Sequence, residues 1–237
     1  LVMGHKPLSD EEKVRREAEK KNESGKRAAF MVHTGLHFKE DGTGFLFGTH
    51  QHLYLVDAET GETKQLTDGE VDDIQPRFSP DGRMVVFSSN RLDEPLLNLD
   101  NHDVCTVSVD GGPITRLTTT YGPHFGPVVS PDGKTVAFVG HDCEKGGEYW
   151  NDFHVWTVPA AGGEPRDLTP DLGRPAGNWI ISDIRDVGDA LAPPVWSPDG
   201  RFLYFTLSDS GSVQVCRVPA EGGKVERLTP PGHELDG

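Results

Sequence analysis

The chain has 237 residues with 28 Gly and 18 Pro, and its 23 basic and 38 acidic side chains give a formal net charge of −15. This length allows one large domain with a core that needs no disulfides, and the excess of turn-forming residues argues against a helical bundle. The negative charge argues against nucleic-acid binding because phosphates would be repelled, and no apolar segment approaches the roughly 18 residues that a membrane span needs.

The first predicted element is a charged helix over residues 8–25. Ser9 and Glu12 form the pattern of a capping box, and the residues that follow are charged and favour a helix. We therefore expect residues 1–27 to form an exposed helical leader before the first β-rich unit.

The following residues, 28–230, are built on an internal repeat. A Leu-Thr dipeptide recurs with steps of 51, 51 and 60 residues, at Leu66, Leu117, Leu168 and Leu228. A short β-rich segment keeps the same steps, starting at Leu53, Val104, Val155 and Val215. The tetrapeptide Ser-Pro-Asp-Gly starts at Ser79, Ser130 and Ser197. Because two elements keep one step, the repeat indicates a structural unit.

Each unit is predicted to hold four short antiparallel strands. Ser-Pro-Asp-Gly is a tight-turn sequence between two strand-like segments, since Pro presets φ and Gly tolerates a positive φ. A Gly-Gly pair, or Thr60-Gly61 in the first unit, makes the turn between the third and fourth strands. Four-stranded units at this period are typical of β-propeller blades. A β-sandwich and a parallel solenoid are the alternatives; the fixed step weakens the first and the hairpin turns weaken the second.

The sequence therefore predicts an all-β protein, a β-propeller with four visible four-stranded antiparallel blades. The predicted blades span residues 28–70, 71–119, 120–170 and 171–230, and residues 231–237 form a tail.

Three cysteines, Cys105, Cys143 and Cys216, form neither a disulfide framework nor a zinc pattern. Cys105 and Cys216 occupy the same third-strand position in different blades, so we expect them to pack between sheets as small hydrophobes. The unpaired cysteines and the lack of a visible secretion signal predict a cytoplasmic location, whereas a signal peptide before Leu1 would indicate the periplasm.

One face of the propeller is predicted to be smooth and the other elaborated. In an up-and-down blade the short turns share one face, and the long loops at 88–103, 139–153 and 171–193 share the other. Long loops on a rigid scaffold commonly carry binding residues. The candidates for contact with substrate or with another domain are Arg91, His141, Asp142, Trp150, Trp179, Asp183 and Arg185. Asp183 and Arg185 have a second interpretation, an ion pair that holds the long loop.

No catalytic, cofactor or metal site is predicted in this sequence. A metal site would have to collect His141, Asp142, Cys143 and His154, but their spacing matches no established ligand set. The Gly-x-Ser-x-Gly pattern of a hydrolase nucleophile is absent from the sequence.

Several segments resemble a known family. The units at 78–83 and 196–202, which contain Ser-Pro-Asp-Gly-Arg, look like TolB-type propeller repeats. Longer stretches are similar to the propeller of acylaminoacyl-peptidase-like members of the prolyl oligopeptidase family, namely residues 86–91, 139–142, 178–185 and 193–196, and the charged helix leading into 41–45. The likeness covers about residues 8–230.

The resemblance implies a propeller of about seven blades that precedes an α/β-hydrolase domain carrying Ser, Asp and His. In such proteins the propeller restricts access to the catalytic cavity and helps select short or N-acylated peptides. Since neither the full ring nor the hydrolase domain is visible in this sequence, we expect a non-catalytic segment of a serine oligopeptidase. Its expected partners are the C-terminal α/β-hydrolase domain and short peptides, and sheet faces left open would favour a homo-oligomer. The alternative is a TolB-like scaffold for protein–protein interaction.

Overall fold

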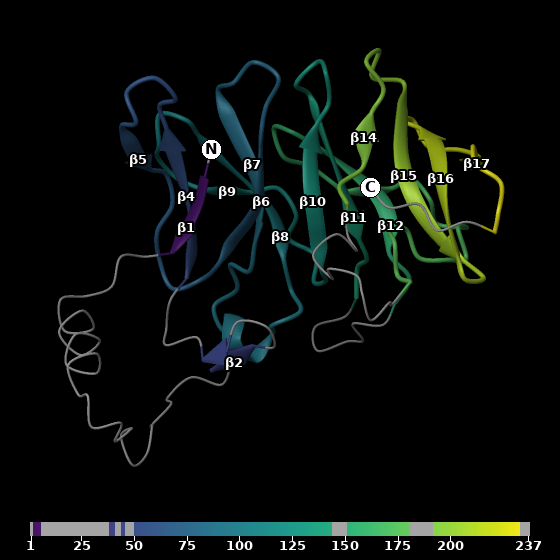
Figure 1. Cartoon of the computed structure of the whole chain (residues 1–237), viewed down its shortest axis with the longest axis horizontal. Helices are drawn as coiled ribbons and strands as arrows, with labels where there is room; N and C mark the ends of the chain where they lie inside the picture. Colours follow the sequence, from purple (N-terminus) through teal and green to yellow (C-terminus); the bar gives the residue numbers. More distant parts are fainter. Residues whose placement is uncertain are drawn as a thin grey trace.

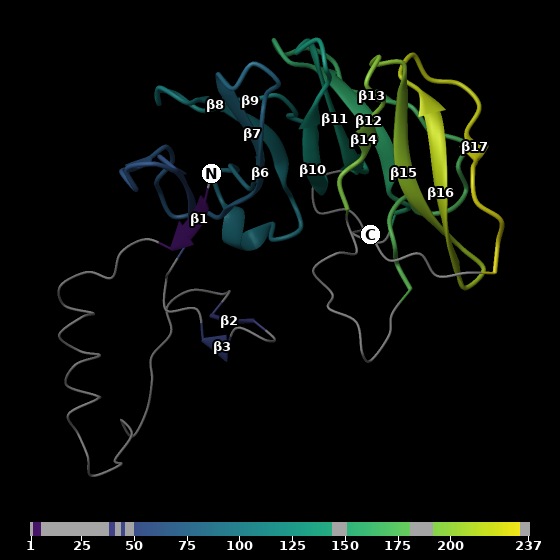
Figure 2. The ribbon, with the colours of Figure 1, turned by 45° about the horizontal axis from the view of Figure 1, so that its top comes forward.

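The computed structural model describes residues 2–5, 38–40, 44–45, 50–143, 151–180 and 192–232. In these residues the chain is nearly all β, and its main sheets stand next to one another in chain order, like neighbouring blades of a propeller (Figures 1 and 2). The helix predicted over residues 8–25 lies outside the described residues.

Three sheets have four antiparallel strands, each paired in chain order. Blade 2 consists of β6 (Asp73–Phe78), β7 (Met84–Ser89), β8 (Asp103–Ser108) and β9 (Thr115–Arg116). Blade 3 consists of β10 (His124–Val129), β11 (Thr135–Gly140), β12 (His154–Pro159) and β13 (Arg166–Asp167). Blade 4 consists of β14 (Val195–Trp196), β15 (Phe202–Asp209), β16 (Ser212–Pro219) and β17 (Glu226–Arg227). The predicted four-stranded unit is confirmed in these blades.

Blade 1, at the N-terminal end, has a different composition from the predicted one. Its third and fourth strands are β4 (Gln51–Val56) and β5 (Thr63–Gln65), as expected, but β4 pairs antiparallel with β1 (Val2–His5). The strands β2 (Lys39–Glu40) and β3 (Gly44–Phe45) pair separately with each other. Residues 2–5 were expected in the helical leader, and that expectation is corrected. An inner strand needs hydrogen-bonding partners along both edges, and β1 satisfies the free edge of β4.

The Ser-Pro-Asp-Gly turns form one hydrogen-bonded unit that recurs in three blades. Ser79 Oγ donates to Asp81 Oδ1 at 2.6 Å and accepts the Met84 backbone N–H at 3.0 Å. Gly82 closes the turn at φ +70°. Corresponding bonds occur at Ser130 and Ser197. The hydrogen bond from Ser79 lowers the pKa of Asp81, so this carboxylate stays ionised in the turn. These compact turns form the smooth face, at the upper edge of Figure 1.

The hydrophobic core lies in the seams between adjacent blades. Val85 and Phe87 of β7 pack in the seam with blade 1, whereas Val86 between them packs in the seam with blade 3. Successive side chains of a strand point to opposite faces, and both faces of an inner blade are covered. This arrangement explains why the inner strands are almost continuously apolar.

The buried cysteines belong to these seams. Cys105 packs in the seam between blades 1 and 2, and Cys216 in the seam between blades 3 and 4. Both thiols are free, and burial raises the pKa of Cys105 to about 12 and that of Cys216 to about 11. Their predicted role as small packing residues is confirmed.

A row of bulges connects the first strands of the blades. The registers of β6 and β10 shift at equivalent positions, where Gln75 has φ +53° and Gly126 has φ +60°. The Gly126 backbone N–H donates to Gln75 Oε1 at 2.7 Å. A Cβ atom on Gly126 would lie 2.9 Å from Cα of Pro193, shortly before β14. The bulges therefore tie the first strands of blades 2 and 3 to the start of blade 4.

Candidate functional site

Four positions of the repeat meet at one end of every blade because the strands alternate in direction. They are the start of the first strand, the residues after the second, the start of the third and the end of the fourth. The long loops leave from this same end, which is the elaborated face at the lower edge of Figure 1. The side chains at these positions are polar and many are buried, so they support the elaborated face from beneath.

The Leu-Thr dipeptide anchors the end of the fourth strand in all four blades. The Thr118 hydroxyl accepts the backbone N–H of Val104 at 2.9 Å, and Leu117 N donates to the carbonyl of Val104 at 2.8 Å. Equivalent hydroxyl bonds of 2.9–3.0 Å are made by Thr67, Thr169 and Thr229. The dipeptide that revealed the repeat is therefore a hydrogen-bonded clasp between the third and fourth strands.

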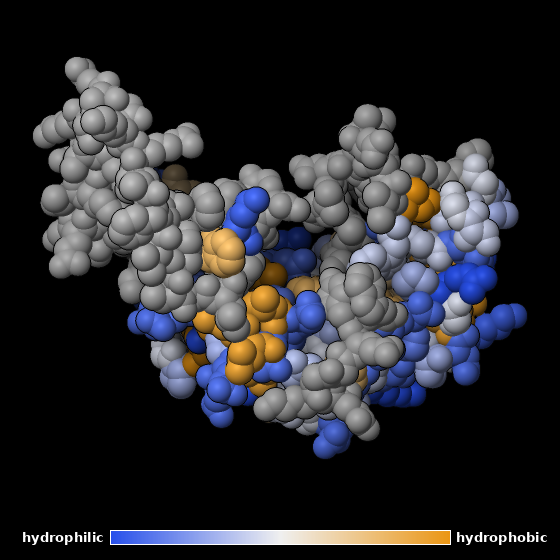
Figure 3. All heavy atoms as spheres, turned by 90° about the horizontal axis from the view of Figure 1, so that it is seen from below, coloured by the Kyte–Doolittle hydropathy of each residue, from blue (hydrophilic) through white to orange (hydrophobic). Residues whose placement is uncertain are grey.

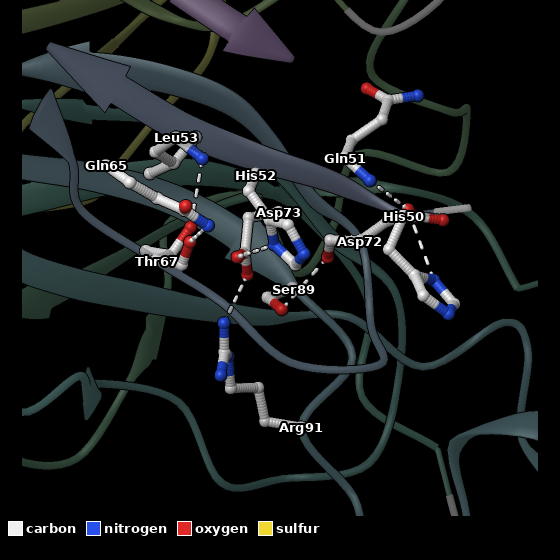
Figure 4. A network of polar contacts seen from close by, with 10 residues as sticks. All are labelled: His50, Gln51, His52, Leu53, Gln65, Thr67, Asp72, Asp73, Ser89 and Arg91. Carbon is white, nitrogen blue, oxygen red and sulfur yellow. Dashed lines mark hydrogen bonds and ion pairs between the residues drawn. The ribbon is translucent and has the colours of Figure 1, made fainter. Parts of the chain in front are cut away.

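A buried polar triad joins blade 1 to blade 2 (Figure 4). The carboxylate of Asp73, at the start of β6, contacts His52 Nδ1 on β4 at 3.5 Å and Arg91 Nη2 at 2.5 Å. Asp73 and His52 are fully buried, and the Arg91 side chain is 21% exposed. Asp73 thus ties a strand of the preceding blade to Arg91, near the start of the loop after β7.

The seam between blades 2 and 3 holds a related network in which the acidic and basic positions are exchanged. His124, at the start of β10, contacts Thr118 Oγ1 through Nδ1 and Asp142 Oδ1 through Nε2, both at 3.1 Å. Thr120 donates a second hydrogen bond of 2.7 Å to the same carboxylate oxygen. Burial alone would raise the pKa of Asp142, but the bonds from His124 and Thr120 outweigh it and lower that pKa.

A third set of pairs links the start of the third strand to the end of the fourth. The pairs are Asp103–Arg116 at 2.8 Å, His154–Asp167 at 2.7 Å and Gln214–Arg227 at 2.8 Å. Burial raises the pKa of Asp103, and the Arg116 guanidinium acts against that rise. Residue types change from blade to blade while the complementary pairing stays.

An aromatic row runs beneath the same face across blades 2 to 4. The His102 ring lies 4.6 Å from that of Phe125, and Phe125 stacks on Phe153 at 6.5 Å. Phe153 in turn contacts His141 edge-on at 5.2 Å and Trp179 at 4.8 Å. His141 is buried here, so it takes part in packing beneath the loops.

The structure brings together only some of the predicted site residues. His141 and Trp179 meet at Phe153, Asp142 lies beside His124, and Arg91 lies apart in the preceding seam. The other predicted residues, Trp150, Asp183 and Arg185, lie outside the described residues. The contact roles assigned to this set remain predictions.

Sequence reasoning overlooked Asp73 and His52. A usable signal was present, because Asp73 and His124 are one 51-residue step apart, as are Arg91 and Asp142. Comparing polar residues at equal repeat positions would have indicated two related networks.

The polar side chains of these networks hold the strand ends and the loops in position. The Thr118 hydroxyl contacts His124, but it is fully buried and accepts the Val104 N–H, so it is not placed as a nucleophile. Across the described residues, no group of three or more His, Cys, Asp or Glu side chains is arranged to hold a metal ion. In the same part of the chain, no helix has the length and apolarity to cross a membrane.

Comparisons with known proteins agree with this architecture. The relative "Uncharacterized peptidase YuxL" of Bacillus subtilis is 32% identical over 190 residues, which are 79% of this chain and 28% of that protein. The dipeptidyl-peptidase 5 of Arthroderma otae is 28% identical over 154 residues, 61% of this chain and 19% of that protein. The chain thus spans less than a third of the length of these relatives.

Solved structures share the fold. The acylaminoacyl peptidase of Pyrococcus horikoshii aligns with a TM-score of 0.64 and 17% identity, over 99% of this chain and 30% of that one. A putative TolB from Agrobacterium tumefaciens aligns with a TM-score of 0.56 and 22% identity, over 77% of this chain and 56% of that one.

The sequence of residues 18–230 matches the family described as acylaminoacyl-peptidase, N-terminal β-propeller domain. This match covers most of the chain, including blades 2 to 4 and the networks beneath the elaborated face. The chain belongs to the family of acylaminoacyl-peptidase N-terminal β-propeller domains.

Proposed function

We propose that this chain is the non-catalytic propeller part of a serine oligopeptidase, where it limits which peptides reach an α/β-hydrolase domain. The family match over residues 18–230 carries the proposal, and the relationship to a Bacillus peptidase supports it. The geometry supports it as well. Buried hydrogen bonds and ion pairs hold the loops of the elaborated face in place, so these loops form a fixed surface rather than a reaction centre. The substrates we propose are short or N-acylated peptides, and the proposed location is the cytoplasm.

The first test is to read the coding sequence on the C-terminal side of residue 237 and to assay the whole gene product. We expect a Gly-x-Ser-x-Gly motif followed by Asp and then His. N-acetylated peptides of increasing length should be hydrolysed at rates that fall with length, and a folded protein such as casein should resist. A gene product without a hydrolase domain, or cleavage independent of length, would overturn the proposal. Residues 1–237 alone should not hydrolyse acyl-peptides.

A second candidate function is a TolB-like scaffold that binds protein partners on the elaborated face. The similarity to the putative TolB from Agrobacterium favours it at the level of the fold. The two proposals separate cleanly, because a scaffold of this kind would come from a gene with a secretion signal and no hydrolase motif. Fractionation of cells into cytoplasm and periplasm provides an independent check.

A further inference from the structure

A cavity of about 420 Å³ lies in the seam between blades 3 and 4. Its walls are formed by the Ser-Pro-Asp-Gly turns of both blades, by Trp196 of β14 and by the turn between β16 and β17. Figure 3 shows the elaborated face, on part of which apolar side chains gather, whereas the cavity lies among the turns of the opposite, smooth face. Its volume is in the range of small-molecule sites, ~300–1,000 Å³.

Trp196 gives the cavity a fixed aromatic wall. Its indole Nε1 donates to the carbonyl of Val128 on β10 at 3.2 Å, and the side chain is partly buried against the core of this seam. At the same repeat position blade 2 has Phe78 and blade 3 has Val129, so of these three blades only blade 4 has an indole. Among side-chain rings the indole attracts a cation most strongly to its face. The wall therefore suits a flat cation that stacks on it.

Among the described residues that line the cavity, three are acidic, namely Asp132, Asp199 and Glu221. In Asp132 and Asp199 the Oδ1 atom accepts the hydroxyl of the turn serine at 2.7 and 2.6 Å, and this bond lowers the pKa of both groups, so they stay ionised. Each carboxylate also has an exposed cation at 3.9 Å, which is too long for a hydrogen bond; the pairs are Asp132–Lys134, Asp199–Arg201 and Glu221–Arg166. Because exposed pairs of this kind contribute little, these carboxylates can accept a ligand.

The turns that frame the cavity are held close together. A Cβ atom on Gly200 would lie 3.8 Å from Cδ of Pro131, so the turn of blade 4 approaches that of blade 3 to van der Waals contact. Arg166 Nη2 donates to the carbonyl of Glu221, which ties the fourth strand of blade 3 to the second turn of blade 4. Walls that are fixed before the ligand arrives reduce the entropy lost on binding.

We propose that this cavity binds a guanidinium group, the head group of an arginine side chain in a peptide, between the indole of Trp196 and the carboxylates around it. A guanidinium is flat, stacks on aromatic rings and pairs with a carboxylate through two parallel hydrogen bonds. An ammonium group lacks this shape and is more strongly hydrated. The net charge of −15 adds a general attraction for cations. This inference goes beyond the proposed function and does not depend on it.

The test is a calorimetric titration of the whole gene product at low salt with n-propylguanidinium. This probe carries the arginine side chain without a peptide bond that a peptidase could cleave. We expect binding to one site per chain with a dissociation constant on the order of 1 mM. Propylurea, which has the same shape without the charge, and butylammonium, the lysine analogue, should bind about tenfold more weakly. Equal binding of propylurea would show an apolar pocket only, and equal binding of butylammonium would show a site for any cation; either result would overturn the proposal.

Matched variants locate the site. Trp196→Leu and Glu221→Gln should each weaken binding about five- to tenfold. Asp199→Asn removes a charge and keeps an acceptor for Ser197, and Asp81→Asn makes the same change in blade 2, outside the cavity. We expect a loss for Asp199→Asn and none for Asp81→Asn. An equal loss for both would attribute binding to the overall charge, and binding unaffected by Trp196→Leu and Glu221→Gln would place the probe elsewhere on the protein. Both results contradict the proposed site.

A second titration identifies the source of the guanidinium. A volume of about 420 Å³ leaves room for peptide units beside the arginine side chain. The peptide Gly-Arg-Gly-amide should therefore bind about tenfold more tightly than free arginine, whose own carboxylate would face the acidic rim. Trp196→Leu should remove this difference. Tighter binding of free arginine would assign the cavity to a free amino acid and overturn the peptide assignment.

Discussion

Arg91 and Asp142 occupy the same position of two successive blades, 51 residues apart, yet one is a cation and the other an anion. Their partners at the start of the first strand differ correspondingly: Arg91 pairs with Asp73, and Asp142 pairs with His124. Blades 2 and 3 therefore each keep an acidic and a basic side chain paired between the first strand and the residues after the second, with the two positions exchanged.

The first prediction concerns the buried carboxylate of Asp73. Asp73→Asn keeps the shape but leaves Arg91 without its counter-charge, and we expect a loss of about 2–4 kcal/mol in the free energy of unfolding. The value is below that of a fully buried pair because Arg91 is partly exposed. Urea unfolding of residues 1–237 measures it, with the exposed Asp68→Asn as control.

Importing the pair from blade 3 tests the idea of exchanged polarity. Asp73→His with Arg91→Asp should be more stable than the sum of the single variants predicts, with a coupling of about 1–3 kcal/mol. Additive effects in the double-mutant cycle would show that the two positions do not act as a pair.

The second prediction concerns the clasp at the end of the fourth strand. Thr118→Val removes the acceptor for the buried Val104 N–H and a contact to His124, so unfolding should become easier by about 1–3 kcal/mol. Thr229→Val removes the same type of bond where the threonine is only partly buried, so water can replace it in part. Thermal unfolding should therefore separate the two variants, and equal effects would contradict the role of burial.

The third prediction concerns the bulge at Gly126. Gly126→Ala has to adopt φ +60° and places Cβ 2.9 Å from the Pro193 backbone, so both strain and steric clash act against it. Gly82→Ala is matched in φ at +70° but has open space around the added methyl group. We expect about 1 kcal/mol of destabilisation for the control and clearly more for Gly126→Ala. Unfolding midpoints of the two variants, measured under one set of conditions, test this difference. Equal midpoints would contradict the steric clash at Gly126.

The fourth prediction is a pH dependence that arises from His102. Burial lowers the pKa of His102 to about 4, whereas the unfolded chain binds the proton near 6.5. The contribution of the neutral ring is therefore complete above pH 6.5 and decreases as the pH falls towards 4, by up to about 3 kcal/mol. His102→Phe keeps an aromatic ring against Phe125 and should remove this slope, which stability curves between pH 7 and 4 would show. Parallel curves for the wild type and the variant would contradict the assignment.

Much of the fold could be predicted because the repeat marks its own turns and clasps. Ser79, Gly82 and Leu66-Thr67 form local motifs whose geometry depends on a few neighbouring residues, so their spacing determines the blade. The two faces also follow from strand alternation alone. The pairing of β1 with β4 could not be predicted, because residues 2–5 and 51–54 meet through long-range contacts that no local pattern records.

The candidate site was less predictable for the same physical reason. Arg91 and Asp142 were identified from their place on long loops, but their partners Asp73 and His124 lie on strands and come close only when the first and second strands of a blade pair. His141, predicted as a contact residue on a long loop, is buried against Phe153, a residue 12 positions later in the chain.

The sequence by itself determined the period, the four-stranded blade and the smooth and elaborated faces, since hairpin turns and strand alternation are local properties. Only the tertiary structure decided which polar groups pair, and it showed that the acidic and basic positions are exchanged between blades 2 and 3. Burial removes these groups from water, so each must find a partner on an adjacent strand or blade, and the packing of whole sheets decides which one is within reach.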